Sequence, residues 1–252
     1  MIVIRFEIDG AIATIAFNRP QKKNAITAAM YQSAADALKE AEANDAVRVI
    51  VMTGDGACFT AGNDLEDFLQ SPPHGDDSPV SQFMNTLRSM TKPVVAAVPG
   101  LAIGIGTTLL MHCDLVYAAN TAKFAMPFSQ LGLCPEFASS VLLPRIAGYQ
   151  RAAEKLLLGE PFDAHEAERM GLVNRVLSAE ELMTFVHTQA TKLAALPSES
   201  LRITKQLMQA DLKSAIAGAM HSEMQHFTQL LQGPDAKEAF SAFLEKRKPV
   251  FR

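Results

Sequence analysis

Glu136 is the acidic residue whose surroundings could turn it into a base. It stands in a stretch, residues 124–148, that is otherwise largely apolar or small, between Pro135 and Phe137. If this segment is buried, loss of solvation raises the pKa of the carboxyl toward the range that suits a general base. The alternative is a surface turn that leaves the carboxylate in water, and the local sequence does not decide between the two.

Two glycine-bearing segments could supply backbone donors for an anion. AGNDL at 61–65 follows the short run ACFT, and GLAIGIGTTLL at 100–110 joins an expected strand to an expected helix. Glycines at such a junction let N–H groups face a ligand near a helix N-terminus, and one donor from each segment would form an oxyanion hole. A structural role fits as well: Gly104 and Gly106 could allow close helix–strand packing, and Asn63 or Asp64 could cap a helix.

Other kinds of site are not indicated by the sequence. Leu109 stands where a dinucleotide fingerprint would need its third glycine, and the GK[ST] and GxSxG motifs are missing. The six histidines are dispersed, which argues against a metal site. We therefore expect no cofactor and no metal.

The charge pattern also narrows the partners. A formal net charge of −4 with scattered Lys and Arg disfavours nucleic acid. The basic cluster Lys246, Arg247, Lys248 and Arg252 favours a solvated tail over a phosphate-binding role. The sequence enters a strand pattern without a leader, and no apolar run approaches the ~18 residues of a membrane span, so we expect a cytoplasmic protein and no membrane partner.

The elements that would position these residues alternate between strands and helices. Asp9-Gly10 predicts a hairpin between strands at 2–8 and 11–17, and Thr27 can cap a helix running to about residue 43. Apolar runs at 47–53 and 93–98 end at glycine-bearing loops. This pattern predicts an α/β fold with ligand-binding loops at strand ends. Residues 66–83, rich in Pro, Gly, Asp and Ser, are expected to form an exposed loop, and only secondarily a lid.

The C-terminal third is expected to be helical. Ser178-x-x-Glu181 is a capping box for a helix through about residue 196, and Pro234 suits the first turn of another helix. An apolar stripe at helical spacing runs through residues 199–232, and it could pack on its own domain or on another subunit.

Five motifs, in this order and spacing, resemble the crotonase (enoyl-CoA hydratase/isomerase) superfamily: NRPQKKNAIT (18–27), GDGACFTAGNDL (54–65), KPVVAAVPGLAIGIG (92–106), CDLVYAA (113–119) and GLVNRV (171–176). The resemblance implies a spiral of ββα units over residues 1–195, followed by a helical region at 196–252 that assembles trimers or hexamers. It implies an acyl-CoA thioester as substrate and an oxyanion hole made by the backbone N–H groups of Ala61 and Ile105. The substrate would be bound by Ala61, Gly62, Asn63, Asp64, Leu65, Gly104 and Phe128.

The chain departs from the hydratases of this superfamily at their two glutamates. Those places hold Thr108 and Phe128, whereas Glu136 follows Pro135 as in the monofunctional Δ3-Δ2-enoyl-CoA isomerases, which the chain resembles here. This predicts an isomerase that converts 3-enoyl-CoA to trans-2-enoyl-CoA in fatty acid β-oxidation, with Glu136 as the single catalytic base. The alternatives are another crotonase reaction, either hydration or isomerisation of a ring-derived CoA thioester, and a noncatalytic acyl-CoA-binding or scaffold protein.

Overall fold

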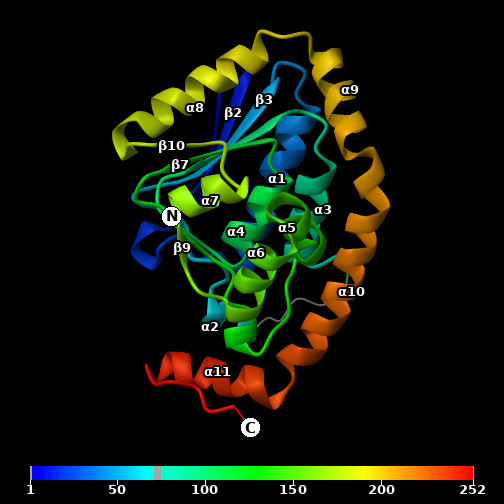
Figure 1. Ribbon diagram of the computed structural model, residues 1–252. Coiled ribbons are helices and arrows are strands. Elements are labelled where there is room, and N and C mark those ends of the chain that lie inside the picture. Colours follow the sequence, from blue (N-terminus) through cyan, green and yellow to red (C-terminus); the bar gives the residue numbers. More distant parts are fainter. Residues whose placement is uncertain (1, 71–74, 76, 252) are drawn as a thin grey trace.

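A computed structural model describes residues 2–70, 75 and 77–251 of the chain (Figure 1). The larger of its two sheets has the strand order β1-β2-β3-β5-β7-β10. Only β1 and β2 pair antiparallel in it, and Ile12 lies opposite Asp9 across the Asp9-Gly10 turn, so the predicted hairpin is confirmed. These strands are β1 (Ile4–Asp9), β2 (Ile12–Phe17), β3 (Val49–Gly54), β5 (Val94–Val98), β7 (Leu115–Ala119) and β10 (Arg175–Leu177).

The smaller sheet has the order β4-β6-β8-β9, with β4, β6 and β8 parallel. Each of these three follows directly on a strand of the larger sheet, so that β3-β4, β5-β6 and β7-β8 are successive two-strand units, each followed by helical structure. The predicted α/β fold of repeated ββα units is confirmed. The strands are β4 (Cys58–Thr60), β6 (Leu101–Ile103), β8 (Lys123–Ala125) and β9 (Phe162–Asp163).

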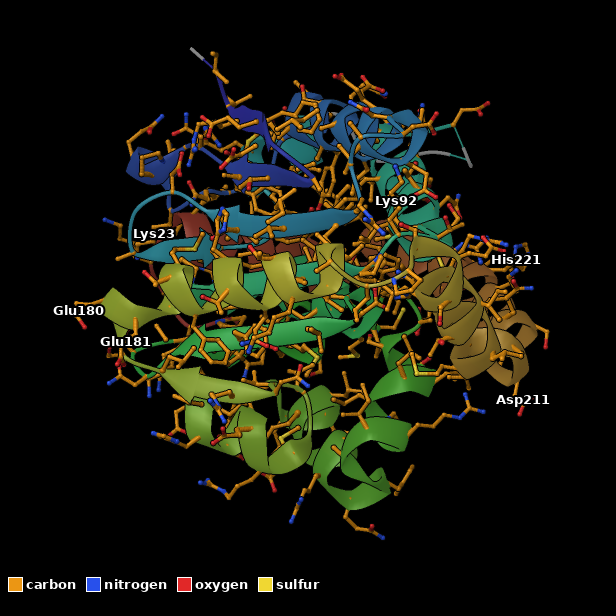
Figure 2. All side chains as sticks on the ribbon, turned by 90° about the horizontal axis from the view of Figure 1, so that it is seen from above. Lys23, Lys92, Glu180, Glu181, Asp211 and His221 are labelled. Atoms are coloured by element: carbon orange, nitrogen blue, oxygen red, sulfur yellow. The ribbon has the colours of Figure 1, made fainter. Side chains whose placement is uncertain are left out.

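Helices cover both faces of the larger sheet, which explains the unbroken apolar runs of its strands. In β3, Ile50 and Met52 belong to the main core, whereas Val49 and Val51 pack in a second cluster with α8 (Ala179–Ala194). Figure 2 shows α8 lying along this sheet. The predicted caps are confirmed: the hydroxyls of Thr27 and Ser178 accept backbone hydrogen bonds at the start of α1 (Ala28–Ala43) and of α8.

The expectation of a loop at 66–83 is wrong for most of that segment. Residues Leu65–Gln70 form α2, and Pro79–Ser89 form α3, which packs on α1. Ser78 caps α3, and Pro79 occupies its first turn. Backbone N–H groups in the first turn make no hydrogen bond within the helix, so proline, which lacks an N–H, is well tolerated there. Residues 71–74 and 76 lie outside the described part of the chain.

The remaining helices surround the smaller sheet and extend away from it. Three C-terminal helices follow α8: α9 and α10 run along one side of the molecule, and α11 returns beneath it (Figure 1). Pro234 begins α11, as predicted. Within the described ranges, no helix combines the length and apolar character needed to cross a membrane. These helices are α4 (Ile105–Thr108), α5 (Ser139–Ala147), α6 (Tyr149–Ala153), α7 (Ala164–Met170), α9 (Ser198–Gln209), α10 (Lys213–Leu231) and α11 (Pro234–Leu244).

Candidate active site

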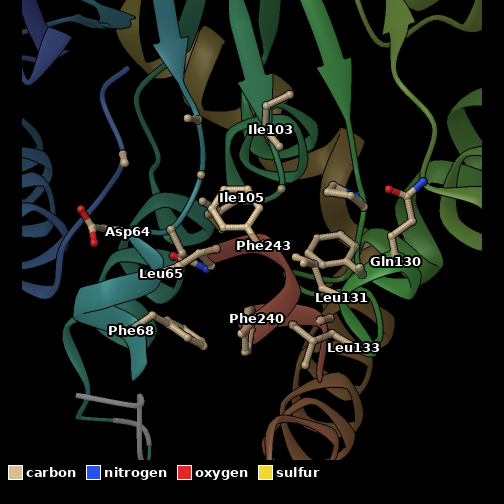
Figure 3. A pocket seen from close by; sticks show the side chains of 18 of the residues that line it. Asp64, Leu65, Phe68, Ile103, Ile105, Gln130, Leu131, Leu133, Phe240 and Phe243 are labelled. Carbon is tan, nitrogen blue, oxygen red and sulfur yellow. The ribbon is translucent and has the colours of Figure 1, made fainter. Parts of the chain in front are cut away.

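A cavity of about 780 Å³ opens where the strands of the smaller sheet end and α11 passes beneath them (Figure 3). Its wall is mostly apolar and combines loops of the core with C-terminal residues such as Phe227, Phe240 and Phe243. All residues expected from the sequence to form the site line this cavity, namely Ala61, Gly62, Asn63, Asp64, Leu65, Gly104, Ile105, Phe128 and Glu136.

The register of the smaller sheet brings the glycine-bearing segments together. Parallel pairing of β4 with β6 and of β6 with β8 places their carboxyl ends at one edge. The segments then lie in close contact: a Cβ on Gly62 would lie 2.7 Å from the carbonyl oxygen of Ile103, and one on Gly106 would lie 2.7 Å from a methyl of Thr60 and 3.0 Å from its carbonyl oxygen. Gly62 also has a φ of 86°, a conformation open to glycine. Gly62 and Gly106 therefore allow close packing of the two segments, and this packing also brings the backbone amides of the two segments to the cavity.

The amides of this edge are not equally available. Ala61 donates its N–H to the carbonyl of Lys23 at 2.9 Å, and Gly62 donates to the Thr60 hydroxyl at 3.0 Å. Among the described residues, the N–H groups of Asn63 and Ile105 have no acceptor. For Ile105 this follows from its place at the start of α4, where helix N–H groups lack partners. The expectation that Ala61 is a free donor is wrong, because Lys23 already binds its amide.

Glu136 is buried and lines the cavity, so the surface-turn alternative does not hold. It lies in the segment that joins η3 (Ser129–Leu131) to α5 and is 8% exposed. Its Oε1 is a buried oxygen with no hydrogen-bond partner among the described residues. Burial, and secondly the charge of Glu223, raise the pKa of Glu136 to about 8. Such a carboxyl can hold a proton or release it near neutral pH.

The backbone around Glu136 is held from several sides. Phe137 and Ala138, which follow it, are both in the left-handed region with φ of 57°. The ring nitrogen Nε2 of His112 lies 2.8 Å from the carbonyl oxygen of Phe137, and the two rings stack 3.7 Å apart. Burial lowers the pKa of His112 to about 4, so the ring is neutral at pH 7 and its N–H can donate to that carbonyl.

The carboxylate of Asp64 lines the cavity but is already paired. Its carboxylate pairs with Arg19 at 2.5 Å and accepts a hydrogen bond from the Asp67 amide at the start of α2. Burial alone would raise its pKa, but these partners lower it below the ordinary value. The two places that hold glutamates in hydratases carry no acid here: Thr108 is buried, and Phe128 contributes an apolar side chain to the cavity wall.

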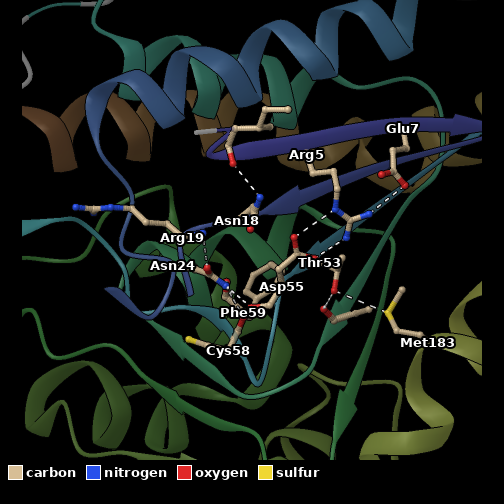
Figure 4. Close-up of polar contacts among 12 residues, drawn as sticks. Arg5, Glu7, Asn18, Arg19, Asn24, Thr53, Asp55, Cys58, Phe59 and Met183 are labelled. Atoms are coloured by element: carbon tan, nitrogen blue, oxygen red, sulfur yellow. Dashed lines mark hydrogen bonds and ion pairs between the residues drawn. The ribbon is translucent and has the colours of Figure 1, made fainter. Parts of the chain in front are cut away.

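A buried asparagine anchors the segment that contacts Ala61. The Asn24 side-chain amide lies 2.7 Å from the carbonyl oxygen of Cys58 and 3.0 Å from that of Asp55, and its Oδ1 accepts from the Arg19 amide (Figure 4). The turn at Arg19–Asn24 is thereby fixed against β4. This accounts for the motif at 18–27, whose lysines Lys22 and Lys23 lie at the cavity wall.

Two further polar residues near the site were not foreseen from the sequence. Tyr31, on α1, donates its hydroxyl to Oδ1 of Asn63 at 2.5 Å, and Glu223, on α10, binds the backbone just after Glu136. Both sit within apolar helical patterns. A tyrosine or glutamate on the buried stripe of an amphipathic helix is the only signal that could have indicated them.

Comparison with known proteins shows which family has this arrangement. The profile described as "Enoyl-CoA hydratase/isomerase" matches residues 7–252, nearly the whole chain. The chain belongs to this family. As an enoyl-CoA hydratase/isomerase family member it is an acyl-CoA enzyme of the crotonase type, which confirms the resemblance seen in its motifs.

Relatives within the enoyl-CoA hydratase/isomerase family carry different activities in their names. Enoyl-CoA delta isomerase 2 of Rattus norvegicus is 40% identical over 85% of this chain, which spans only 56% of the rat protein. The 1,2-epoxyphenylacetyl-CoA isomerase of Escherichia coli K12 is 35% identical over 100% of this chain and 98% of its own length. The solved structure of Pseudomonas aeruginosa OdaA is 44% identical, covers 97% of this chain and 99% of its own, and superposes with a TM-score of 0.94.

Proposed function

We propose that the protein is a Δ3-Δ2-enoyl-CoA isomerase that uses Glu136 as its single acid–base group. One observation carries the proposal: of the three acids that line the cavity, Glu136 alone is buried with an unpartnered oxygen. Asp64 is paired with Arg19, and Glu66 is exposed. A 1,3 shift of a double bond needs one base that removes a proton and returns it, and one such group is present.

The proposed reaction begins when the Glu136 carboxylate removes a proton from C2 of a 3-enoyl thioester. The electrons of that C–H bond delocalise into the thioester and give a dienolate, and Glu136 then returns the proton to C4, leaving the double bond between C2 and C3. A pKa of about 8 suits both halves of this exchange. The apolar wall keeps water away from the intermediate.

The oxygen of the dienolate needs donors, and the free amides of Asn63 and Ile105 support this role. They lie on the two segments that Gly62 and Gly106 hold in contact. Each such donor is typically worth about 3 to 4 kcal/mol of transition-state stabilisation. Lys22, Lys23 and Arg247 are exposed at the cavity wall and supply positive charge that suits the phosphates of a CoA moiety. Arg247 is also paired with Glu238 and Glu245.

The test is turnover of trans-3-hexenoyl-CoA, read by the absorbance of the conjugated product. Glu136→Gln keeps the shape of the side chain and removes the base, so kcat should fall by at least ~10²-fold. Glu66→Gln, which neutralises an exposed acid of the same cavity, is the matched control and should retain wild-type turnover. Equal activity of the Glu136 variant and the control would remove Glu136 from the mechanism.

A second candidate is isomerisation of a ring-derived CoA thioester. The near full-length match to the E. coli 1,2-epoxyphenylacetyl-CoA isomerase favours it, and the cavity of about 780 Å³ has room for a ring. Incubation with 1,2-epoxyphenylacetyl-CoA, followed by product analysis, would distinguish it from the linear substrate. Hydration is less well supported, because Thr108 and Phe128 offer no second acid; crotonyl-CoA should give little or no 3-hydroxybutyryl-CoA.

A further inference from the structure

The turn that carries Glu136 is strained, and α5 holds only part of it. Ser139, the first residue of α5, donates its amide at 3.1 Å and its hydroxyl at 2.6 Å to the Glu136 carbonyl, but these bonds leave the amides of Ala138 and Ser140 without a partner from the turn itself. Phe137 and Ala138 both adopt the left-handed region with φ of 57°, which is unfavourable for a residue with a side chain. Ala138 precedes the first residue of α5, and it has no side chain that could cap this helix. A turn of this kind persists only when neighbouring groups hold it in place.

Glu223 supplies the missing contacts from α10. Its carboxylate accepts hydrogen bonds from the Ala138 amide at 2.6 Å, from the Ser140 amide at 3.0 Å, and from the Ser140 hydroxyl. A residue more than 80 positions away thus takes the place of the N-cap of α5. The negative charge also lies at the helix end that favours it.

The two carboxyl groups form a buried pair with unequal surroundings. Glu223 has three donors, whereas Oε1 of Glu136 has no partner among the described residues. Burial raises the pKa of Glu223, and the hydrogen bonds from Ser140 and Ala138 act against this, so that Glu223 keeps the negative charge more readily than Glu136 does. When only one of the two carboxyls is protonated, the proton is therefore on Glu136.

The other titratable groups around the pair stay neutral between about pH 5 and 8. Tyr31 on α1 has a pKa raised well above its ordinary value by burial and then by Glu136, and burial together with Glu223 raises the pKa of Cys134 to about 11. His112, which contacts Phe137, has its pKa lowered to about 4. The protonation of Glu136 in this range is therefore coupled mainly to Glu223.

We propose that Glu223 is a positioning residue for Glu136: by binding the Ala138 and Ser140 amides it fixes the turn that aims Glu136 into the cavity, and it places a second negative charge behind that carboxyl. The kinetic consequence rests on the proposed isomerase function, whereas the effects on the turn and on Glu136 titration do not.

The experiment compares Glu223→Gln, Glu223→Ala and the control Ser222→Ala, an exposed neighbour on α10. Glutamine keeps one acceptor oxygen but loses the charge and one backbone hydrogen bond. Carboxyl ¹³C NMR of the free protein, with Glu136→Gln to assign the signal, should show Glu136 titrating at lower pH in Glu223→Gln than in the wild type. Hydrogen exchange of a peptide spanning residues 136–141 should be faster in both Glu223 variants, and neither effect should appear in the control.

Kinetics with trans-3-hexenoyl-CoA give the second readout. At about pH 9, where Glu136 is ionised in the wild type and in both variants, displacement of the base should lower kcat by about 10-fold in Glu223→Gln and about 10²-fold in Glu223→Ala, with KM within about twofold of the wild type. An unchanged Glu136 titration, or an unchanged kcat in folded Glu223→Gln, overturns the proposal. If the wild-type enzyme does not turn over 3-enoyl-CoA, the proposed function fails on its own, and the titration and exchange measurements decide the role of Glu223.

Discussion

Replacing Glu136 by glutamine should make the fold more resistant to alkaline pH, at the same time as it removes activity. In the folded protein the carboxyl has a pKa of about 8, compared with an ordinary value of 4.5. The folded state therefore binds more protons than the unfolded state between these two values. The stabilisation from the protonated carboxyl is complete below the lower value and is lost as pH rises through about 8.

The size of this loss follows from the two pKa values. Each tenfold difference in proton affinity corresponds to about 1.4 kcal/mol. The wild type should therefore lose stability as pH rises from 4.5 to about 8, and the loss of folding free energy should reach about 5 kcal/mol once pH exceeds 8. Glutamine carries no charge at any pH and avoids this loss. Any pH-independent cost of burying its amide adds a constant offset, so the informative quantity is the change with pH of the difference between the two proteins.

The assay is urea unfolding followed by circular dichroism at about pH 5 and about pH 9, at one fixed protein concentration. The stability of Glu136→Gln relative to wild type should rise between the two pH values by about 2 to 5 kcal/mol. Glu180→Gln, which alters an exposed glutamate on α8, should show no such rise. A difference between Glu136→Gln and wild type that stays constant over this range would refute the burial of an ionisable Glu136.

Three further outcomes are expected. Because the base must be ionised, kcat/KM for 3-hexenoyl-CoA should rise about tenfold per pH unit up to about pH 8 and then level off; a flat profile from pH 6 to 8 would contradict this. Gly62→Ala sets a Cβ 2.7 Å from the Ile103 carbonyl oxygen at a φ of 86°, so it should lower stability by about 2 to 4 kcal/mol and abolish turnover. A Cβ added at Gly218 would meet nothing within 4 Å beyond its own stretch of helix, so Gly218→Ala should have neither effect. Thermal unfolding and kcat measure both variants. Leu207 and Met208 on α9 are 70% and 67% exposed, and we expect them to lie at a subunit interface of a trimer or hexamer. Light scattering should show that Leu207→Glu dissociates the assembly. The control Lys192→Glu should leave the mass of the assembly unchanged.

Local signals were enough to predict much of the framework. The Asp9-Gly10 hairpin, the Thr27 and Ser178 caps and the first turn at Pro234 depend on residues close in sequence, and the structure confirms them. At 66–83 the same kind of signal was present but misread: Ser78 followed by Pro79 begins a helix, whereas the composition of the segment suggested a loop.

Features that depend on distant contacts could not be predicted. Glu136 lines its pockets together with side chains of α10 and α11, which lie more than 80 residues further along the chain, so its local sequence left two alternatives. The availability of the amides in AGNDL depends on the carbonyl of Lys23, which binds Ala61 and leaves Asn63 free. Glu223 is one acid within an apolar helical stripe, and its role is set by a turn more than 80 residues before it.

The close contact between Gly62 and Ile103 means that the backbone donors of the cavity and the shape of its acyl-binding wall depend on different parts of the fold. The spacing of the Asn63 and Ile105 amides is set by main-chain pairing of two strands, which side-chain substitutions elsewhere in the wall leave intact. The opposite wall is built from side chains on helices, among them Phe68, Phe227 and Phe240. Substitutions there can enlarge or shrink the room for an acyl group while the polarising edge stays in register, so new substrate preferences can arise on this scaffold without rebuilding its chemistry.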